Sequence, residues 1–172
     1  VMSYGSVSRG AVFALQSQGF NDITVYTHRD FTNVADQLPT VVYKHFETDV
    51  DGKLVAIDHD GTSYPFSKAL EDADIIVNGI FQNPLKPLMF VSKEDSSKLK
   101  NGALIVDISC DEGMGFWCAR PTSFKDPIFE IEGKHYYSVD HSPSYYWNSA
   151  SVEISEALLP YIEIVMDGPE AW

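Results

Sequence analysis

The first eleven residues constrain the fold of this chain most, because they combine an apolar start, a turn marked by glycine and the opening of a helix. Val1 and Met2 are apolar, Gly5 marks the turn, and apolar residues at helical spacing follow as far as Gln18. A strand that turns sharply into a helix presents free backbone N–H groups and the positive end of the helix dipole to a phosphate, and a glycine allows close approach. We therefore expect a dinucleotide-binding turn at Gly5.

This turn departs from the usual G-x-G-x-x-G pattern. Ser3 and Ser8 stand where the pattern has its first and third glycines, and Gly10 comes two positions late. A strand that feeds such a turn usually has about five or six residues, but only Val1 and Met2 precede Ser3 here. We therefore expect the chain to be an excised portion of a longer, two-domain protein.

The next strand bears on the choice of cofactor. Ile23–Thr27 is a β-branched and aromatic run, which predicts a strand. In NAD-binding units, an acidic residue about 20 positions after the glycine turn binds the ribose hydroxyls. Thr27, His28 and Arg29 occupy that place, and their side chains would receive a 2′-phosphate that a carboxylate would repel. The sequence therefore favours NADP(H), with a solvated basic turn as the alternative interpretation.

Two continuous apolar runs, Asp74–Ile80 and Ala103–Ser109, indicate strands buried on both faces of a sheet. With the intervening helical patterns they predict an α/β fold with a doubly wound, Rossmann-type, mostly parallel sheet. Extended segments with Asp-Gly and Glu-Gly turns predict small hairpin excursions at 40–61 and 129–138. Further helices are predicted over residues 92–100 and 148–166.

The composition bears on the cellular compartment and on the kinds of partner that the protein could bind. The 172 residues, with 44% hydrophobic content, fit a single dinucleotide-binding domain over residues 1–172. The net charge of −13 repels phosphate backbones and anionic lipid surfaces, which disfavours nucleic-acid and membrane partners. Cys110 and Cys118 form neither a C-x-x-C pair nor a disulfide framework, and no ligand spacing supports zinc. We expect a cytoplasmic protein without a metal site.

Ligands of a doubly wound sheet bind at the carboxyl ends of its strands. The loop 79–82 after the first apolar run is therefore a candidate for the ribose and nicotinamide half of the cofactor. At the end of the second run, Asp111 is the residue best placed for chemistry, with a turn cap as the alternative. Asp107 is expected to hydrogen-bond a neighbouring loop, and Cys110 is expected to be an inert buried thiol rather than a nucleophile.

A third polar stretch, Val139–Ser144, precedes the last predicted helix and has the composition of a site loop. It contains His141, for which substrate contact and a structural hydrogen bond are both open interpretations.

Taken in order, these stretches carry a family resemblance. They are the glycine turn, the strand Asp74–Gly79, Val106–Asp111, Arg120–Ser123 and Val139–Pro143. Together they resemble the cofactor domain of the alanine dehydrogenase and pyridine nucleotide transhydrogenase family, with the related saccharopine dehydrogenases. Within this family, three blocks are most similar to those of the carboxyethylornithine synthases: Gly5–Ala11, Val77–Gln82 and Asp140–Ser151. Those enzymes are NADPH-dependent reductases that join pyruvate to the side-chain amine of ornithine or lysine.

The resemblance implies roles for individual residues. Asp111 matches the family's aspartate beside the nicotinamide, and His141 takes the place of an asparagine near the substrate, so both are expected to be catalytic. The family's principal proton-transfer lysine and histidine lie in a preceding domain, so this chain alone is expected to be inactive. The implied cofactor-binding residues are Ser3, Tyr4, Gly5, Ser6, Val7, Thr27, His28, Arg29, Gly79, Ile80, Phe81, Ile108, Ser109, Cys110, Val139 and Ser142.

The resemblance also implies an activity. It predicts an NADP-dependent oxidoreductase that acts on C–N bonds in amino-acid metabolism, with pyruvate and a basic amino acid as substrates and a homo-oligomer as the full-length form. Two alternatives remain open at this point. The chain could be the cofactor domain of an alanine or saccharopine dehydrogenase, or a nucleotide-binding module without catalysis.

Overall fold

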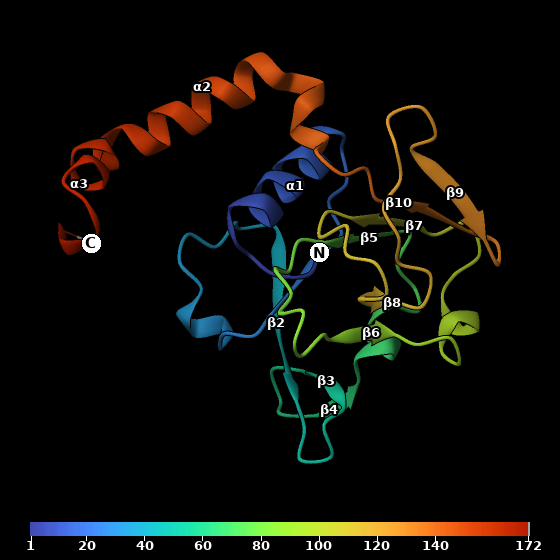
Figure 1. Ribbon diagram of the computed structural model, residues 1–172. Helices are drawn as coiled ribbons and strands as arrows, with labels where there is room; N and C mark the ends of the chain where they lie inside the picture. The colour runs from blue at the N-terminus through green and yellow to red at the C-terminus, as the bar shows by residue number, and fades with distance from the viewer. Residues whose placement is uncertain (172) are drawn as a thin grey trace. The chain divides into compact units, whose positions relative to one another are not determined.

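The computed structural model describes residues 1–171. The chain divides into two compact units, of which the first is Val1–Asp140 and the second begins at His141. The first unit is a mostly parallel sheet with helix α1 (Ser6–Ser17) against it (Figure 1). Its strands are β1 (Ile23–Thr27), β2 (Val41–Thr48), β3 (Leu54–Ile57), β4 (Ser63–Pro65), β5 (Ile75–Asn78), β6 (Met89–Val91), β7 (Leu104–Asp107), β8 (Gly115–Phe116), β9 (Ile128–Ile131) and β10 (Lys134–Tyr137). Short 3-10 helices lie at Phe31–Asn33, Phe66–Leu70 and Ser96–Lys98.

Met2 joins the two halves of the sheet. Strands run in the order β4-β3-β2-β1 on one side and β5-β7-β10-β9 on the other, and Met2 forms a parallel bridge to Tyr26 of β1 and to Asn78 of β5. The Met2 N–H donates to the Val77 carbonyl at 2.8 Å. Strands β1 to β4 therefore lie on one side of Met2 and β5, β7, β10 and β9 on the other, which makes the fold doubly wound, as predicted.

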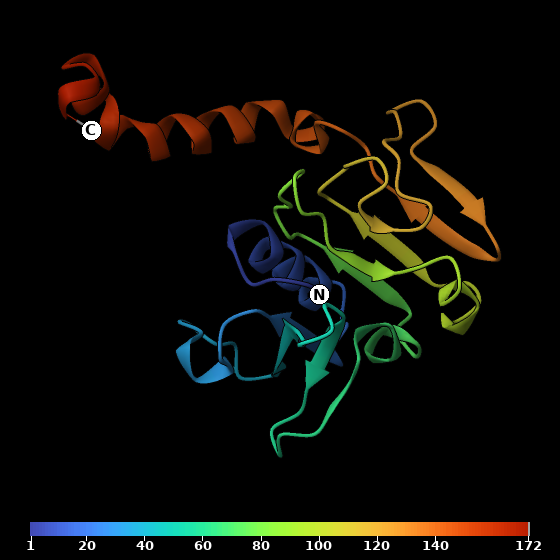
Figure 2. The ribbon, with the colours of Figure 1, turned by 60° about the horizontal axis from the view of Figure 1, so that its bottom comes forward.

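In the main sheet, the strands β1, β2, β5, β7 and β10 supply the parallel pairs and the hairpins lie at the two edges, while β6 and β8 form a separate parallel pair. Figure 2 shows β7 between β5 and β10. Residues 41–48 had been expected to belong to a hairpin excursion, but β2 pairs in parallel with β1 and is a strand of the main sheet. Only its far end turns back into β3.

The core has two parts. Val12 of α1 packs with Ile23, Val25 and Val41, so the helix covers the face formed by β1 and β2. The larger part is rich in aromatic rings and fills the space between the sheet and the β6–β8 pair, with Phe46, Phe66, Phe90, Phe116 and Tyr136 all buried. This core fixes the ends of the central strands, where the candidate site lies.

The helix predicted over 92–100 is wrong, since only the 3-10 turn Ser96–Lys98 forms. Ser92 Oγ does accept the Asp95 N–H at 3.3 Å, as a cap would. However, Leu99 turns to an extended conformation and enters the core at 3% exposure. Lys100 then donates its N–H to Glu71, so tertiary contacts end the helix early.

The second unit is helical and is described here by itself. Its elements are the 3-10 helix Ser142–Tyr146, α2 (Trp147–Leu158), the 3-10 helix Leu159–Tyr161, α3 (Ile162–Met166) and the 3-10 helix Pro169–Ala171. The predicted continuous helix over 148–166 is interrupted at Pro160, which has no N–H to donate. Among residues 1–171, no helix combines the length and apolarity needed to cross a membrane.

Candidate functional site

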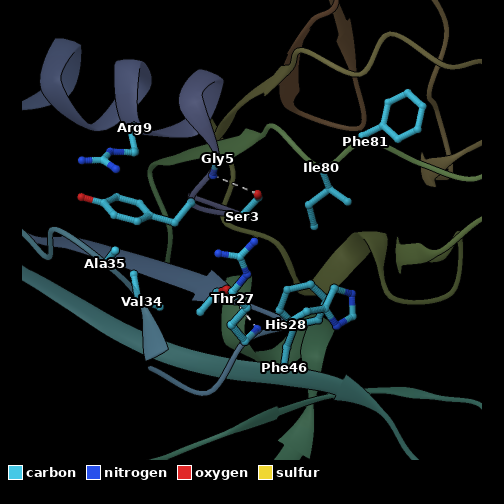
Figure 3. Close-up of a pocket in the computed structure, with 12 residues that line it drawn as sticks. Ser3, Gly5, Arg9, Thr27, His28, Val34, Ala35, Phe46, Ile80 and Phe81 are labelled. Carbon is cyan, nitrogen blue, oxygen red and sulfur yellow. Dashed lines mark hydrogen bonds between the residues drawn. The ribbon is translucent and has the colours of Figure 1, made fainter. Parts of the chain in front are cut away.

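A cavity of about 330 Å³ opens at the carboxyl ends of the Met2 bridge, β1 and β5 (Figure 3). This is the point where the chain departs to both sides of the sheet, the place where doubly wound folds bind ligands. Its volume is within the usual range for a small-molecule site. Its lining residues are Ser3, Tyr4, Gly5, Arg9, Thr27, His28, Arg29, Val34, Ala35, Phe46, Ile80 and Phe81.

The turn into α1 is open toward a phosphate. Gly5 is the N-cap residue of this twelve-residue helix, and no side chain caps its first turn. Ser3 has φ of 77°, the left-handed backbone that the first glycine of the fingerprint would adopt easily and that a serine adopts at some cost. Ser3 Oγ accepts the Gly5 N–H at 3.3 Å, which stabilises the turn (Figure 3).

Gly79 compensates for the serine at the third fingerprint position. Ser8 is fully buried, and its Oγ donates to the Met2 carbonyl at 3.1 Å. A Cβ on Gly79 would lie 2.3 Å from Ser8 Oγ, which is a severe clash. The close approach between helix and strand is therefore made possible by a glycine on β5's side of the contact. Gly79, predicted to bind cofactor, packs against Ser8 and is not among the residues that line the cavity.

The segment Thr27–Arg29, predicted to select the cofactor, lines the cavity. Thr27 is buried, and its Oγ1 accepts the Arg29 N–H at 3.2 Å. The His28 ring lies 3.9 Å, centroid to centroid, from Phe46, and burial lowers the pKa of His28, which favours the neutral imidazole. The Asp30 carboxylate is held in its own turn, where Oδ1 accepts the Thr32 N–H at 2.9 Å and its hydroxyl at 2.7 Å.

A second cation, Arg9, lines the same cavity and was missed from the sequence. Its guanidinium lies 5.2 Å from the centre of the Tyr4 ring and 3.3 Å from the Asp36 carboxylate. The Tyr4 hydroxyl donates to the Asp36 carbonyl at 3.2 Å, and burial raises the pKa of Tyr4 to about 12, so the phenol is neutral. Arg9 follows Gly5 by about one helical turn, and this spacing was the signal that could have identified it.

Val34, Ala35 and Phe46 also line the cavity and were not predicted. They come from the segments after β1 and within β2. Nothing local in the sequence marks them, because their place depends on the pairing of β2 with β1.

Asp107 organises the loops at the carboxyl ends of β5 and β7. It is fully buried, and its carboxylate accepts hydrogen bonds from Asn78 Nδ2 at 2.9 Å, from the Ser109 N–H at 3.1 Å and from the Tyr136 hydroxyl. Asn78 Oδ1 in turn accepts the Ile80 N–H at 3.2 Å, and Ser109 Oγ donates to the Ile80 carbonyl. Burial raises the pKa of Asp107. Asp107 was expected to hydrogen-bond a neighbouring loop, but its partners are side chains of the neighbouring strands β5 and β10 and the N–H of Ser109 in the loop that follows it.

The loop after β7 carries three of the other predicted residues, Ile108, Cys110 and Asp111. The Ile108 N–H donates to the Asn78 carbonyl at 2.9 Å. Cys110 has φ of 58°, and its Sγ lies 3.5 Å from the carbonyl oxygen of Val139. Burial raises the pKa of the Cys110 thiol, which opposes a nucleophilic thiolate. Asp111 is half-buried, and its carbonyl accepts the Met114 N–H at 3.3 Å.

The remaining predicted residues are placed as follows. Ser6 and Val7 form the first turn of α1. Ile108, Ser109, Cys110, Asp111 and Val139 are not among the residues that line the cavity. His141 and Ser142 belong to the second unit, where His141 has φ of 61° and its carbonyl accepts the Ser144 N–H at 2.8 Å. Across residues 1–171, no three His, Cys, Asp or Glu side chains group in a way that could hold a metal ion.

Comparison with known proteins adds three findings. Residues 19–170 match the family model described as "Alanine dehydrogenase/PNT, C-terminal domain". N(5)-(carboxyethyl)ornithine synthase of Clostridium botulinum (strain Hall) is 40% identical over 94 residues, which are 54% of this chain and 29% of that protein. Alanine dehydrogenase 1 of Staphylococcus aureus (strain NCTC 8325) is 27% identical over 101 residues, which are 59% of this chain and 27% of that protein.

A solved structure of an L-alanine dehydrogenase has the same fold, with a TM-score of 0.64 at 17% identity. The match covers 98% of this chain and 43% of that one. The chain therefore spans less than half the length of these relatives.

Proposed function

Since the chain belongs to the family of alanine dehydrogenase/PNT C-terminal domains, dehydrogenase domains that bind a nicotinamide cofactor, we propose that it binds NADP(H) in the cavity beside Gly5. The observation that carries the choice of NADP(H) is the lining of this cavity by Thr27, His28 and Arg29 at the end of β1. An NAD site has a carboxylate at this place, and here the adjacent carboxylate of Asp30 is engaged by Thr32. A guanidinium and a hydroxyl suit a 2′-phosphate.

The residues present fit such a cofactor. The uncapped first turn of α1 offers N–H groups to the pyrophosphate, and Ser3 and Gly5 shape the backbone there. Arg9, which is paired with Asp36, places a second guanidinium at the cavity. When bound, the cofactor supplies the hydride of the reaction, and the protein positions it.

We also propose that this chain is part of a longer protein, an opine-type reductase that joins pyruvate to the side-chain amine of ornithine or lysine through reduction of an imine. The support is the 40% identity to an N(5)-(carboxyethyl)ornithine synthase over half of this chain. Asp111 is proposed to favour the cationic imine through its charge, and His141 to contact the substrate. We further propose a cytoplasmic protein that is homo-oligomeric at full length. Alanine or saccharopine dehydrogenase activity, and a non-catalytic module, are the competing possibilities.

Calorimetric titration of this chain with NADPH and with NADH tests the cofactor proposal. Tighter binding of NADPH is expected, and Arg29→Ala should weaken NADPH binding by about 1–3 kcal/mol, roughly five- to 150-fold, because a charge-assisted hydrogen bond is lost. The affinity for NADH should stay within about twofold.

Lys125→Ala is the matched control. It removes the same single positive charge from an exposed position that does not line the cavity. A similar loss in both variants would mean that only long-range charge matters. Equal affinities of the unmodified chain for NADPH and NADH would refute the NADP(H) proposal.

A further inference from the structure

We propose that His45 is a positioning residue for cofactor selection, because it holds the Thr27–Arg29 segment in the form that receives the 2′-phosphate. The proposal rests on the proposed NADP(H) site and extends it to a residue that does not itself line the cavity.

The hydrogen bonds of His45 show how it acts. His45 lies on β2 directly opposite Thr27, the last residue of β1. Its Nδ1 lies 3.1 Å from the Thr27 carbonyl oxygen and 3.2 Å from the Arg29 carbonyl oxygen. Both neighbours are acceptors, so Nδ1 must carry the proton and donate to them. One imidazole therefore spans the segment on which cofactor selection depends.

The ring is partly buried. The His45 side chain is 21% exposed, and its Nε2 lies 3.4 Å from Glu47 Oε2 on the same strand, a contact that is a hydrogen bond only when both ring nitrogens carry protons. The next residue, Phe46, is buried and packs against the His28 ring. β2 thus supports the segment from two consecutive positions, one polar and one apolar.

The hydrogen bonds of His45 favour phosphate binding because they keep the carbonyl oxygens of Thr27 and Arg29 from turning toward the cavity. A carbonyl oxygen free to rotate toward the cavity would repel a phosphate and compete with it for the Arg29 guanidinium. His45 engages the oxygens of Thr27 and Arg29 from the side of β2. The Arg29 N–H is bound to Thr27 Oγ1, so the turn is held at both ends. Pre-organisation of this kind lowers the ordering cost of binding.

The test measures NADPH and NADH affinities for three variants of the chain by calorimetry. His45→Val removes the donor but suits a strand, His45→Asn keeps a donor near the place of Nδ1, and His45→Gln moves the donor toward the place of Nε2. His45→Val and His45→Gln should weaken NADPH binding by about tenfold and change NADH binding by less than about threefold. His45→Asn should retain most of the preference.

Thermal unfolding of each variant accompanies the titrations. A parallel loss of both cofactors in His45→Val and His45→Gln would reveal a general structural role and overturn the proposal, as would an unchanged affinity ratio. If His45→Val does not fold, the comparison of the Asn and Gln variants decides in the same way. A parent chain without any preference for NADPH would instead refute the proposed cofactor, which the parent titration reports separately.

Discussion

Replacement of Asp107 by alanine should be one of the most damaging single changes in this chain. The carboxylate is fully buried and is the shared acceptor for Asn78, Ser109 and Tyr136. Alanine removes the acceptor and leaves the buried donors of Asn78 and Tyr136, and the half-buried Ser109 N–H, without this partner.

The magnitude follows from these bonds. A buried donor left unsatisfied costs about 1–3 kcal/mol, and the costs in one network are not additive. We therefore expect Asp107→Ala to lower the free energy of unfolding by about 3–5 kcal/mol, a large part of the about 5–15 kcal/mol typical of a domain. Asp107→Asn keeps one carbonyl acceptor and lets the Tyr136 hydroxyl accept instead, so its cost at neutral pH should stay below about 1.5 kcal/mol.

The free energies of unfolding of the parent chain and of Asp107→Asn should also depend differently on pH. Burial raises the pKa of Asp107 above its ordinary value of 3.8 in the folded state, so folding favours the protonated carboxyl. The stability that Asp107 contributes is then fully present below pH 3.8 and is lost as the pH rises through the raised folded pKa. The free-energy difference between the parent chain and Asp107→Asn should move against the parent over that interval.

Urea unfolding followed by circular dichroism, repeated from pH 4 to pH 8, measures these differences. Asp74→Ala serves as a control, because Asp74 is an exposed carboxylate paired with Lys100 and should cost less than about 1 kcal/mol. A loss below about 1 kcal/mol for Asp107→Ala, or a parent-minus-Asn difference that does not change with pH, would contradict this account of the network.

Two further predictions concern other residues. Gly79→Ala should lower the free energy of unfolding by about 1–3 kcal/mol, because the new Cβ would lie 2.3 Å from Ser8 Oγ. In a double-mutant cycle, Ser8→Ala should recover part of that loss, and strict additivity of the two changes would disprove the contact. In the full-length protein, Asp111→Asn should lower kcat by about a hundredfold or more and leave the Kd for NADPH within a few-fold. Steady-state kinetics and calorimetry measure the two quantities, and a kcat near that of the parent would mean that Asp111 takes no part in the chemistry.

Much of the fold could be predicted from the sequence because its signals are local. Helix α1 and strand β1 follow from periodicity and β-branched composition, and their observed bounds match the expected ones closely. The buried parallel strands β5 and β7 follow from continuous apolar runs. Family membership was also predictable, since the motif blocks extend along the chain and residues 19–170 match the family model.

Parts of the candidate site were predictable for the same reason. Ser3, Gly5 and the Thr27–Arg29 segment stand at fixed distances from a glycine turn, and the structure brings them to one cavity. The helix predicted over 92–100 failed because the local capping signal at Ser92 was outweighed by burial of Leu99. A helix cap contributes less free energy than the burial of a leucine side chain in the core.

The sequence by itself therefore determined helix α1, the strands β1, β5 and β7, the glycine turn between Met2 and α1, and the chemical types at the end of β1. The tertiary structure alone decided that Arg9 lines the cavity, that His45 holds the backbone of Thr27 and Arg29, and that Gly79 makes room for Ser8. The His45 and Gly79 contacts join strands or helices that lie far apart in the chain. Neighbouring residues set backbone conformation, but contacts of this kind depend on which strands pair and how closely a helix packs on the sheet.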